Sequence, residues 1–187
     1  NEQPVLGAAG EIRYEWELNR LELMKSVRMW QGKHVLSADR LTVLKKTGEI
    51  MAEGSVRTAF PRLPKDETKT EEIIEIGGSR LSFNPPDQLL TFEQDCWLKS
   101  KAAGLKSDRL DVTLGGKTAE IQQIEARGKV VITEKLREGK GGMAIYDFEQ
   151  DTIVLTDNPT VIDKEKGVIA GEKLTFRLGE GRIQVEN

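Results

Sequence analysis

The chain has 187 residues, with 28 Lys and Arg against 31 Asp and Glu and a formal net charge of −3. This length allows one or two domains and a sizeable hydrophobic core. Basic residues form no stripe, which argues against a nucleic-acid partner, and no apolar run is long enough to cross a bilayer. The start at Asn1 without a methionine suggests a mature or trimmed chain, so an exported origin stays open.

Residues suited to catalysis are scarce. Cys96 is the single cysteine and His34 the single histidine, so an internal disulfide, a Cys-based metal site and a multi-His metal site are all excluded. We therefore expect no enzyme, no catalytic residue, no metal and no cofactor. Cys96 fits a small buried apolar residue, and His34, beside Lys33 in a polar turn, fits a surface histidine.

Alternation of apolar and polar residues dominates the chain. Residues 18–29 near the N-terminus fit either a helix or a strand, but 50–58 and 124–132 alternate strictly, with charged residues on one face. A period of two is typical of half-buried strands. Gly- and Pro-containing turns separate these runs, so the sequence predicts an all-β protein.

A short motif recurs four times along the chain. Its form is small, polar, basic, Leu, polar, then Val or Phe, at 38–43, 78–83, 107–112 and 171–176. A turn and a second alternating run follow each copy. A repeat of this kind is one supersecondary unit, here a hairpin, and several such units stack to share one core.

The motif contains a phase shift. Leu36 and Ala38 share one strand face, whereas Leu41 and Val43 are out of phase with them. A bulge or corner at residues 39–40 lets one strand bury both pairs. Because the shift recurs, we expect one corner line along the molecule and two facing sheets. The predicted fold is an antiparallel, jelly-roll-like two-sheet array of repeated hairpins.

Two segments depart from the repeat. Residues 59–70 contain Pro61, Pro64 and a run of charges, which predicts an exposed inserted loop within one domain spanning 1–187. The run 183–187 matches only the first half of a second strand. The final unit is therefore expected to be incomplete and to leave an open edge.

Charged groups in the chain have simple explanations. Asp147, Glu149, Asp151 and Asp157 form the densest acidic group; a solvated strand face explains it better than a calcium site or a catalytic carboxylate pair, because EF-hand spacing is missing. An enzyme acting on carbohydrate would need two of these acids converging in a groove. Each copy of the repeat has a basic residue at its third position. These residues fit the outward-facing residue of a bulge better than a row of contacts with an anion. They are Arg40, Arg80, Arg109 and Lys173.

The segment 37–56, Ser-Ala-Asp-Arg-Leu-Thr-Val-x-x-Lys-Thr-Gly-Glu-Ile-x-Ala-x-Gly-x-Val, resembles a known repeat. It is similar to that of the OstA-like (LptA-like) family of periplasmic lipopolysaccharide-transport proteins. Echoes of it lie at 124–133, 153–159 and 167–176. The resemblance runs from about Leu18 to the end of the chain.

This resemblance implies a β-jellyroll that shields the acyl chains of lipopolysaccharide, or of another acylated lipid, between its sheets. It also implies a periplasmic location after removal of a signal peptide. Related jellyroll proteins would pair with it through edge strands, and head-to-tail self-association would follow the same route. Without a membrane helix of the LptC kind, the resemblance favours a soluble LptA-like role, unless an anchor has been removed.

The inward-facing residues of the repeats are the candidates for contact with lipid. The small residues Ala52, Gly54, Ala126 and Gly128 would leave room for chains. The alternative is a structural or adhesive β-repeat protein in which the same residues fill a dry core. The candidates are Leu36, Ala38, Leu41, Val43, Ile50, Ala52, Val56, Leu81, Phe83, Leu110, Val112, Ile124, Ala126, Val130, Ile132, Leu155, Leu174 and Phe176.

Overall fold

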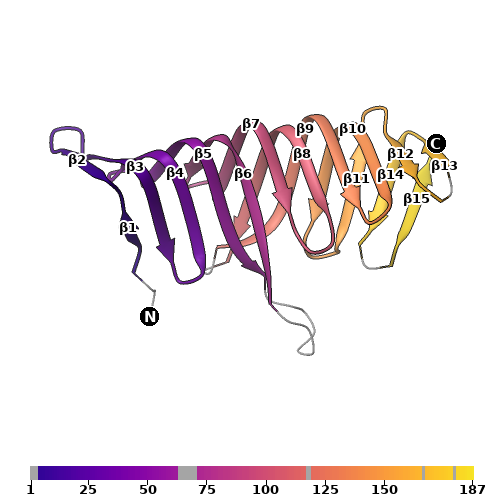
Figure 1. Ribbon diagram of the computed structural model, residues 1–187, viewed down its shortest axis with the longest axis horizontal. Coiled ribbons are helices and arrows are strands. Elements are labelled where there is room, and N and C mark those ends of the chain that lie inside the picture. The colour runs from indigo at the N-terminus through magenta and orange to yellow at the C-terminus, as the bar shows by residue number, and fades with distance from the viewer. Residues whose placement is uncertain (1–3, 63–70, 117–118, 166, 179) are drawn as a thin grey trace.

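A computed structural model of the protein describes residues 4–62, 71–116, 119–165, 167–178 and 180–187. These residues form strands and turns only, and the predicted all-β fold is confirmed. Figure 1 shows the strands following one another along the long axis, with the N-terminus at one end and the C-terminus at the other. The strands are β1 (Leu6–Ala8), β2 (Glu11–Glu15), β3 (Arg20–Gln31), β4 (His34–Leu44), β5 (Glu49–Arg62), β6 (Glu72–Asn84), β7 (Leu89–Lys99), β8 (Gly104–Gly115), β9 (Glu120–Glu134), β10 (Arg137–Asp147), β11 (Thr152–Thr156), β12 (Thr160–Asp163), β13 (Gly167–Ala170), β14 (Lys173–Arg177) and β15 (Arg182–Glu186).

Every strand pairs antiparallel with its neighbours, in the order β1-β3-β4-β5-β6-β7-β8-β9-β10-β11-β14-β15. Off this path, β2 pairs with β3, β12 pairs with β10 and β13, and β13 pairs with β12. Sequential hairpins therefore build the whole array, as the repeat predicted. Such local connections are the simplest way to join antiparallel strands.

A corner line crosses the strands at one height. On β3, β5, β7 and β9 it consists of two consecutive residues with positive φ: Lys25–Ser26, Gly54–Ser55, Gln94–Asp95 and Gly128–Lys129. The register shifts at each of these pairs. Two successive residues in the left-handed conformation bend the strand sharply, as the extra residue of a β-bulge does.

The intervening strands pass the corner with a single residue. In β4 this residue is Asp39, because Ala38 pairs with Val27 and Arg40 with Met24 on either side of it. With two corner residues, the inward-facing residues on either side of the corner are an even number of positions apart, as in an unbroken strand. With one corner residue, they are an odd number of positions apart. This difference explains the phase shift in the repeated motif. The predicted corner is confirmed, but it lies at Asp39 alone, since Arg40 already pairs with Glu53 of β5.

The corner divides the array into two facing sheets. The strand halves continuous with β2, β11, β14 and β15 form sheet I, and those continuous with β1, β12 and β13 form sheet II. Figure 1 shows the strands bending over along one long side of the molecule. On the opposite side, here called the mouth, lie the hairpin turns of both sheets.

Inward residues of sheet I form two apolar rows that run from one end of the molecule to the other. The row nearer the corner joins Ile12, Leu23, Leu41, Ala52, Leu81, Phe92, Leu110, Ala126, Ala144, Leu155, Leu174 and Val185 through successive cross-strand pairs. The row nearer the mouth joins Tyr14, Leu21, Val43, Ile50, Phe83, Leu90, Val112, Ile124, Tyr146, Ile153, Phe176 and Ile183. Cross-strand pairs of this kind stabilise a sheet and build its core face.

The structure decides between two predicted conformations for one segment and corrects the predicted boundary of another. The segment 18–29, which fitted a helix or a strand, lies mostly in β3. The inserted loop was predicted to begin at Ala59, but Ala59–Arg62 continue β5 and pair with 72–75 of β6. Pro61 is tolerated there because β5 has passed its last paired residue of β4, at Ala59, so one side of it is an edge. The rest of that loop, 63–70, lies outside the described residues.

Candidate functional site

The space between the sheets is open in the N-terminal half. A cavity of about 870 Å³ lies between β3–β5 of sheet II and β5–β8 of sheet I. This volume is within the range of ligand pockets, roughly 300–1,000 Å³. Apolar side chains dominate its lining. They include Met29, Leu36, Ile50, Phe60, Leu81, Phe83, Leu90 and Leu114.

All of the candidate interior residues face the core between the two sheets. Four of them, Leu36, Ile50, Leu81 and Phe83, line the open cavity. The others do not, and most of these are buried against neighbouring side chains. The structure therefore separates one set of similar positions into four cavity-lining residues, all in the N-terminal half, and other residues that do not line the cavity, among them the buried Leu41 and Val56 of the same half.

The C-terminal half has a filled interior. Leu155 and Phe176 of sheet I are almost fully buried, and they face glycines of β10. A Cβ on Gly139 would lie 2.8 Å from Phe176 Cζ, and one on Gly141 would lie 2.9 Å from Leu155 Cδ1. Because these glycines carry no side chain, the large side chains of sheet I reach the backbone of sheet II and fill the interior at these two positions.

The small residues expected to make room for a ligand do not line the cavity. Gly54 and Gly128 are corner residues with φ of 74° and 77°, and the carboxylates of Asp39 and Asp108 occupy the positions that their Cβ atoms would take. Ala52 and Ala126 are buried in the corner row of sheet I. The glycines serve backbone geometry, since left-handed φ suits glycine best.

His34 is not the surface histidine that the sequence suggested. It is half-buried at the start of β4, lines the cavity, and makes an edge-on contact with Phe60 at 5.7 Å between ring centroids. Burial lowers the pKa of the imidazole, because desolvation disfavours its charged form. The His34 side chain that lines the cavity is therefore largely uncharged at neutral pH.

A second cavity, of about 660 Å³, adjoins the first and is more polar. Phe60, Pro61 and Glu120 line both cavities, whereas Thr113, Gln122, Gln123, Asp147 and Glu149 line only the second. Two of the four acids in the dense group therefore lie together here. Among the described residues, no group of three or more His, Cys, Asp or Glu is arranged to hold a metal ion.

Arg62 lines the second cavity and bonds across the mouth, from sheet II to sheet I. Its Nη2 donates to the Phe148 carbonyl oxygen at 2.9 Å and to Asp151 Oδ1 at 2.6 Å. The guanidinium also lies over the Phe148 ring, 5.1 Å from its centroid, and Phe148 stacks on Tyr146 at 4.0 Å. Arg62 ends β5 in sheet II, and its partners belong to the β10–β11 turn of sheet I. We call this set of contacts the clasp.

Several residues of the site were not among those predicted from the sequence. Met29, Phe60, Leu90 and Leu114 line the cavity but were not among the candidates. Leu90 alternates with Phe92, and Leu114 with Val112, so their strand periodicity was a usable signal. Phe60 fell within the segment interpreted as a loop. Arg62 had no local signal, since its partners lie 86 and 89 residues further along the chain.

Residues 75–182, more than half of the chain, match the family described as "LptA/(LptD N-terminal domain) LPS transport protein". The chain belongs to this family of lipopolysaccharide-transport proteins, which is not a family of enzymes. The resemblance seen in the repeat is thereby confirmed. No curated protein matches the sequence.

The fold is also that of a solved relative. The structure of LptH, the LptA-homologous periplasmic component of the lipopolysaccharide transport device of Pseudomonas aeruginosa, superposes with a TM-score of 0.59 at 10% identity. The match covers 71% of this chain and 96% of LptH. Within the described residues, no helix has the length and apolarity needed to cross a membrane.

Proposed function

We propose that the protein is a periplasmic carrier that holds the acyl chains of lipopolysaccharide in the open cavity between its two sheets. The observation that supports this proposal most directly is the apolar cavity of about 870 Å³ at the N-terminal half. Its lining residues come from both sheets, and they include Gly32 and Lys33 of the β3–β4 turn at the mouth. A lipid could therefore bury its chains between the sheets while its polar part stays in water.

The energetics of such binding are favourable. Burial of apolar carbon contributes about 0.8 kcal/mol per CH₂, so a chain of a dozen carbons contributes roughly 10 kcal/mol before the cost of ordering it. Part of that gain offsets the lost freedom of the lipid and of the side chains around it. An apolar channel with one open side can thus hold a lipid in water and still release it.

We further propose that copies of this chain, or related jellyrolls, join end to end. Among the described residues, β15 pairs only with β14, and β2 pairs only with β3. The corner row of sheet I ends in Ile12 and Val185, which are 62% and 40% exposed. An apolar row that stops at two exposed edges favours continuation into a partner.

The strand directions permit this continuation. All neighbouring pairs from β2 to β15 are antiparallel and the path has an odd number of steps, so β2 and β15 run in opposite directions. A second copy displaced along the long axis would place its β2 antiparallel beside β15. With Ile12 beside Val185, the corner row continues, Tyr14 meets Ile183, and Glu15 meets Arg182. A head-to-tail contact of this kind does not close on itself and extends into a filament.

The lipid proposal is tested by a charge placed in the cavity. The variant Phe83→Asp puts a carboxylate among apolar side chains, and Phe83→Leu keeps an apolar side chain as the matched control. Binding is measured by displacement of a fluorescent acyl-chain probe with lipopolysaccharide. We expect at least tenfold weaker binding for Phe83→Asp and little change for Phe83→Leu. Equal binding by both folded variants, or no binding by the unaltered protein, would contradict the proposal.

A further inference from the structure

The clasp marks the place where the interior changes character. Phe60 and Pro61, which line the open cavity, come directly before Arg62 in β5. Phe148 and Tyr146, on the other side of the contact, are buried in sheet I. The second cavity reaches the clasp, since Arg62 and Phe148 are among its lining residues. Leu155 and Phe176, which fill the interior against Gly141 and Gly139, follow the clasp partners in the chain.

The clasp is built to hold the two sheets at a fixed separation. One guanidinium bonds to a backbone carbonyl and to a carboxylate, and it packs on an aromatic ring. Glu72, from the neighbouring strand of sheet II, lies 4.0 Å from the same guanidinium. Arg62 retains only about a fifth of its side-chain exposure, whereas Asp151 retains 44%. The guanidinium is therefore partly shielded from water, while the carboxylate stays accessible to it.

We propose that the Arg62–Asp151 clasp is the boundary of the lipid-accessible interior. While it is closed, acyl chains occupy the cavity lined by Leu36 and Phe83 and cannot reach the space around Phe176. Release of the clasp lets the sheets separate at the mouth and joins the two halves into one channel. Arg62 thereby determines how far along the molecule a chain extends. This inference rests on the proposed binding of lipid.

Arg62 differs from another ion-paired arginine near the mouth, because only Arg62 of the two bonds to the opposite sheet. A second ion-paired arginine, Arg137, lies near the mouth in the C-terminal half, bound to Asp163 at 2.8 Å and to Glu134 at 3.5 Å. Those partners belong to β12 and the end of β9, on the same sheet as Arg137. They brace sheet II without joining it to sheet I. Arg62, by contrast, bonds across the mouth.

The test uses a photo-crosslinking phenylalanine analogue placed at position 83 in the open half or at position 176 in the closed half. Each reporter is introduced into the unaltered protein, into Arg62→Met and into the milder Asp151→Asn. Arg109→Met is the matched control, because it removes ion pairs with Asp111 and Glu93 that all lie within sheet I and do not cross to sheet II. Lipopolysaccharide is the probe, and melting curves report folding of every variant.

We expect capture at 83 in all variants, and capture at 176 only when the clasp is removed. It should rise at least fivefold in Arg62→Met, by less in Asp151→Asn, and not at all in Arg109→Met. Strong capture at 176 in the unaltered protein, or none there in a folded clasp variant that is captured at 83, overturns the inference. If Arg62→Met does not fold, Asp151→Asn decides. Absence of capture at 83 everywhere overturns the proposed lipid function itself.

Discussion

The Asp39 side chain lies against the backbone of Gly54 where β4 and β5 pass the corner side by side. Its carboxylate occupies the position that a Cβ on Gly54 would take. The same relationship recurs two hairpins later, where Asp108 Oδ2 lies 2.6 Å from the Cβ position of Gly128. The single corner residue of one strand thus fits into the left-handed pair of the next, which locks the position of the corner.

This relationship makes Gly54→Ala a destabilising change. The new methyl group would meet the Asp39 carboxylate, and Ala disfavours φ of +74°. Gly181→Ala is the control, because Gly181 has φ of +65° with no atom nearby. We expect Gly181→Ala to lower the free energy of unfolding by about 1 kcal/mol and Gly54→Ala by about 2–3 kcal/mol, as measured by urea denaturation. Equal losses would mean that the Asp39 contact has no role at the corner.

Truncation of core phenylalanines distinguishes the two halves of the interior. Phe176→Ala leaves a cavity against Gly139 in a filled core, so we expect a loss of about 3–5 kcal/mol in unfolding free energy. Phe83→Ala enlarges a cavity that is already open, and a loss of about 1–2 kcal/mol is expected. Chemical denaturation of both variants compares them directly. A larger loss at position 83 than at 176 would contradict the division into open and filled halves.

Cys96 provides a pH-dependent test of the core. Burial raises the pKa of its thiol to about 11, and the thiol donates a hydrogen bond to the Asp108 carbonyl oxygen at 3.4 Å. Because the unfolded thiol ionises more readily, the folded state loses stability as the pH rises from about 9 towards 11, by up to about 2–3 kcal/mol. Comparison of unfolding free energies of the unaltered protein and Cys96→Ala isolates this contribution. Parallel pH profiles would show that the thiol is not buried in solution.

A charge exchange at the two ends tests the register of end-to-end pairing. With Ile12 beside Val185, Glu15 of one copy lies beside Arg182 of the next. Either single change, Glu15→Arg or Arg182→Glu, places like charges opposite each other and should weaken association severalfold. The double exchange should restore it. Sedimentation velocity over a concentration series measures the effect, and a double variant as weak as the two singles would rule out this register.

Much of the fold could be predicted from the sequence, because the residue pattern of the repeat indicates both the strands and the corner. Alternation revealed the strands, and the inverted phase between Ala38 and Leu41 revealed the corner. The repeat did not reveal the left-handed pairs, since Lys25–Ser26 and Gln94–Asp95 contain no glycine. Pairing with the neighbouring strands imposes the left-handed conformation on these residues, and the local sequence contains no signal for it.

The state of the interior could not be predicted in the same way. Phe83 and Phe176 occupy equivalent places in two copies of one motif and belong to the same inward row of sheet I, yet one lines a cavity and the other is packed. The difference comes from the facing sheet, where Gly139 admits Phe176. Arg62, which we propose as the boundary between the two halves, has partners that are distant in sequence. Neither influence acts within the repeat itself.

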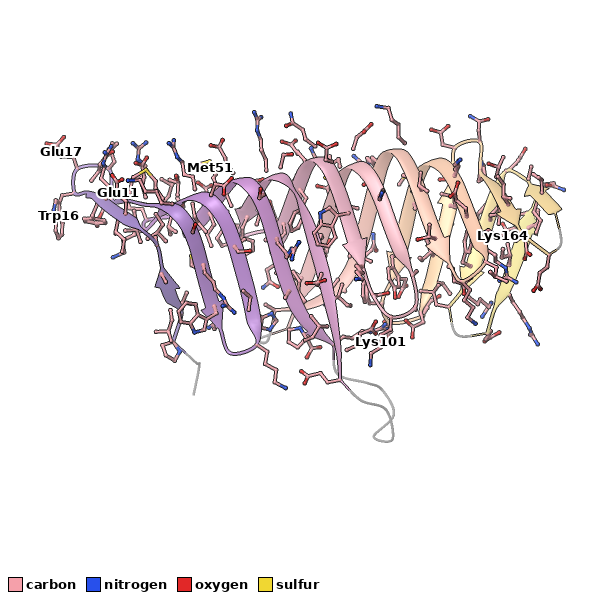
Figure 2. The ribbon with its side chains drawn as sticks, in the orientation of Figure 1. Glu11, Trp16, Glu17, Met51, Lys101 and Lys164 are labelled. Carbon is pink, nitrogen blue, oxygen red and sulfur yellow. The ribbon has the colours of Figure 1, made fainter. Side chains whose placement is uncertain are left out.

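Site-specific photo-crosslinking tests the central claim, that lipid binds between the sheets, most directly. One reporter replaces Phe83 in the cavity, and a second replaces Met51, which is 46% exposed on the outer face of sheet I (Figure 2). Both positions lie in the same half of the molecule, so they differ mainly in the face they occupy. We expect lipopolysaccharide to be captured at position 83 and not at 51. Capture at 51 alone, or at neither position in the folded protein, would contradict a lipid-binding interior.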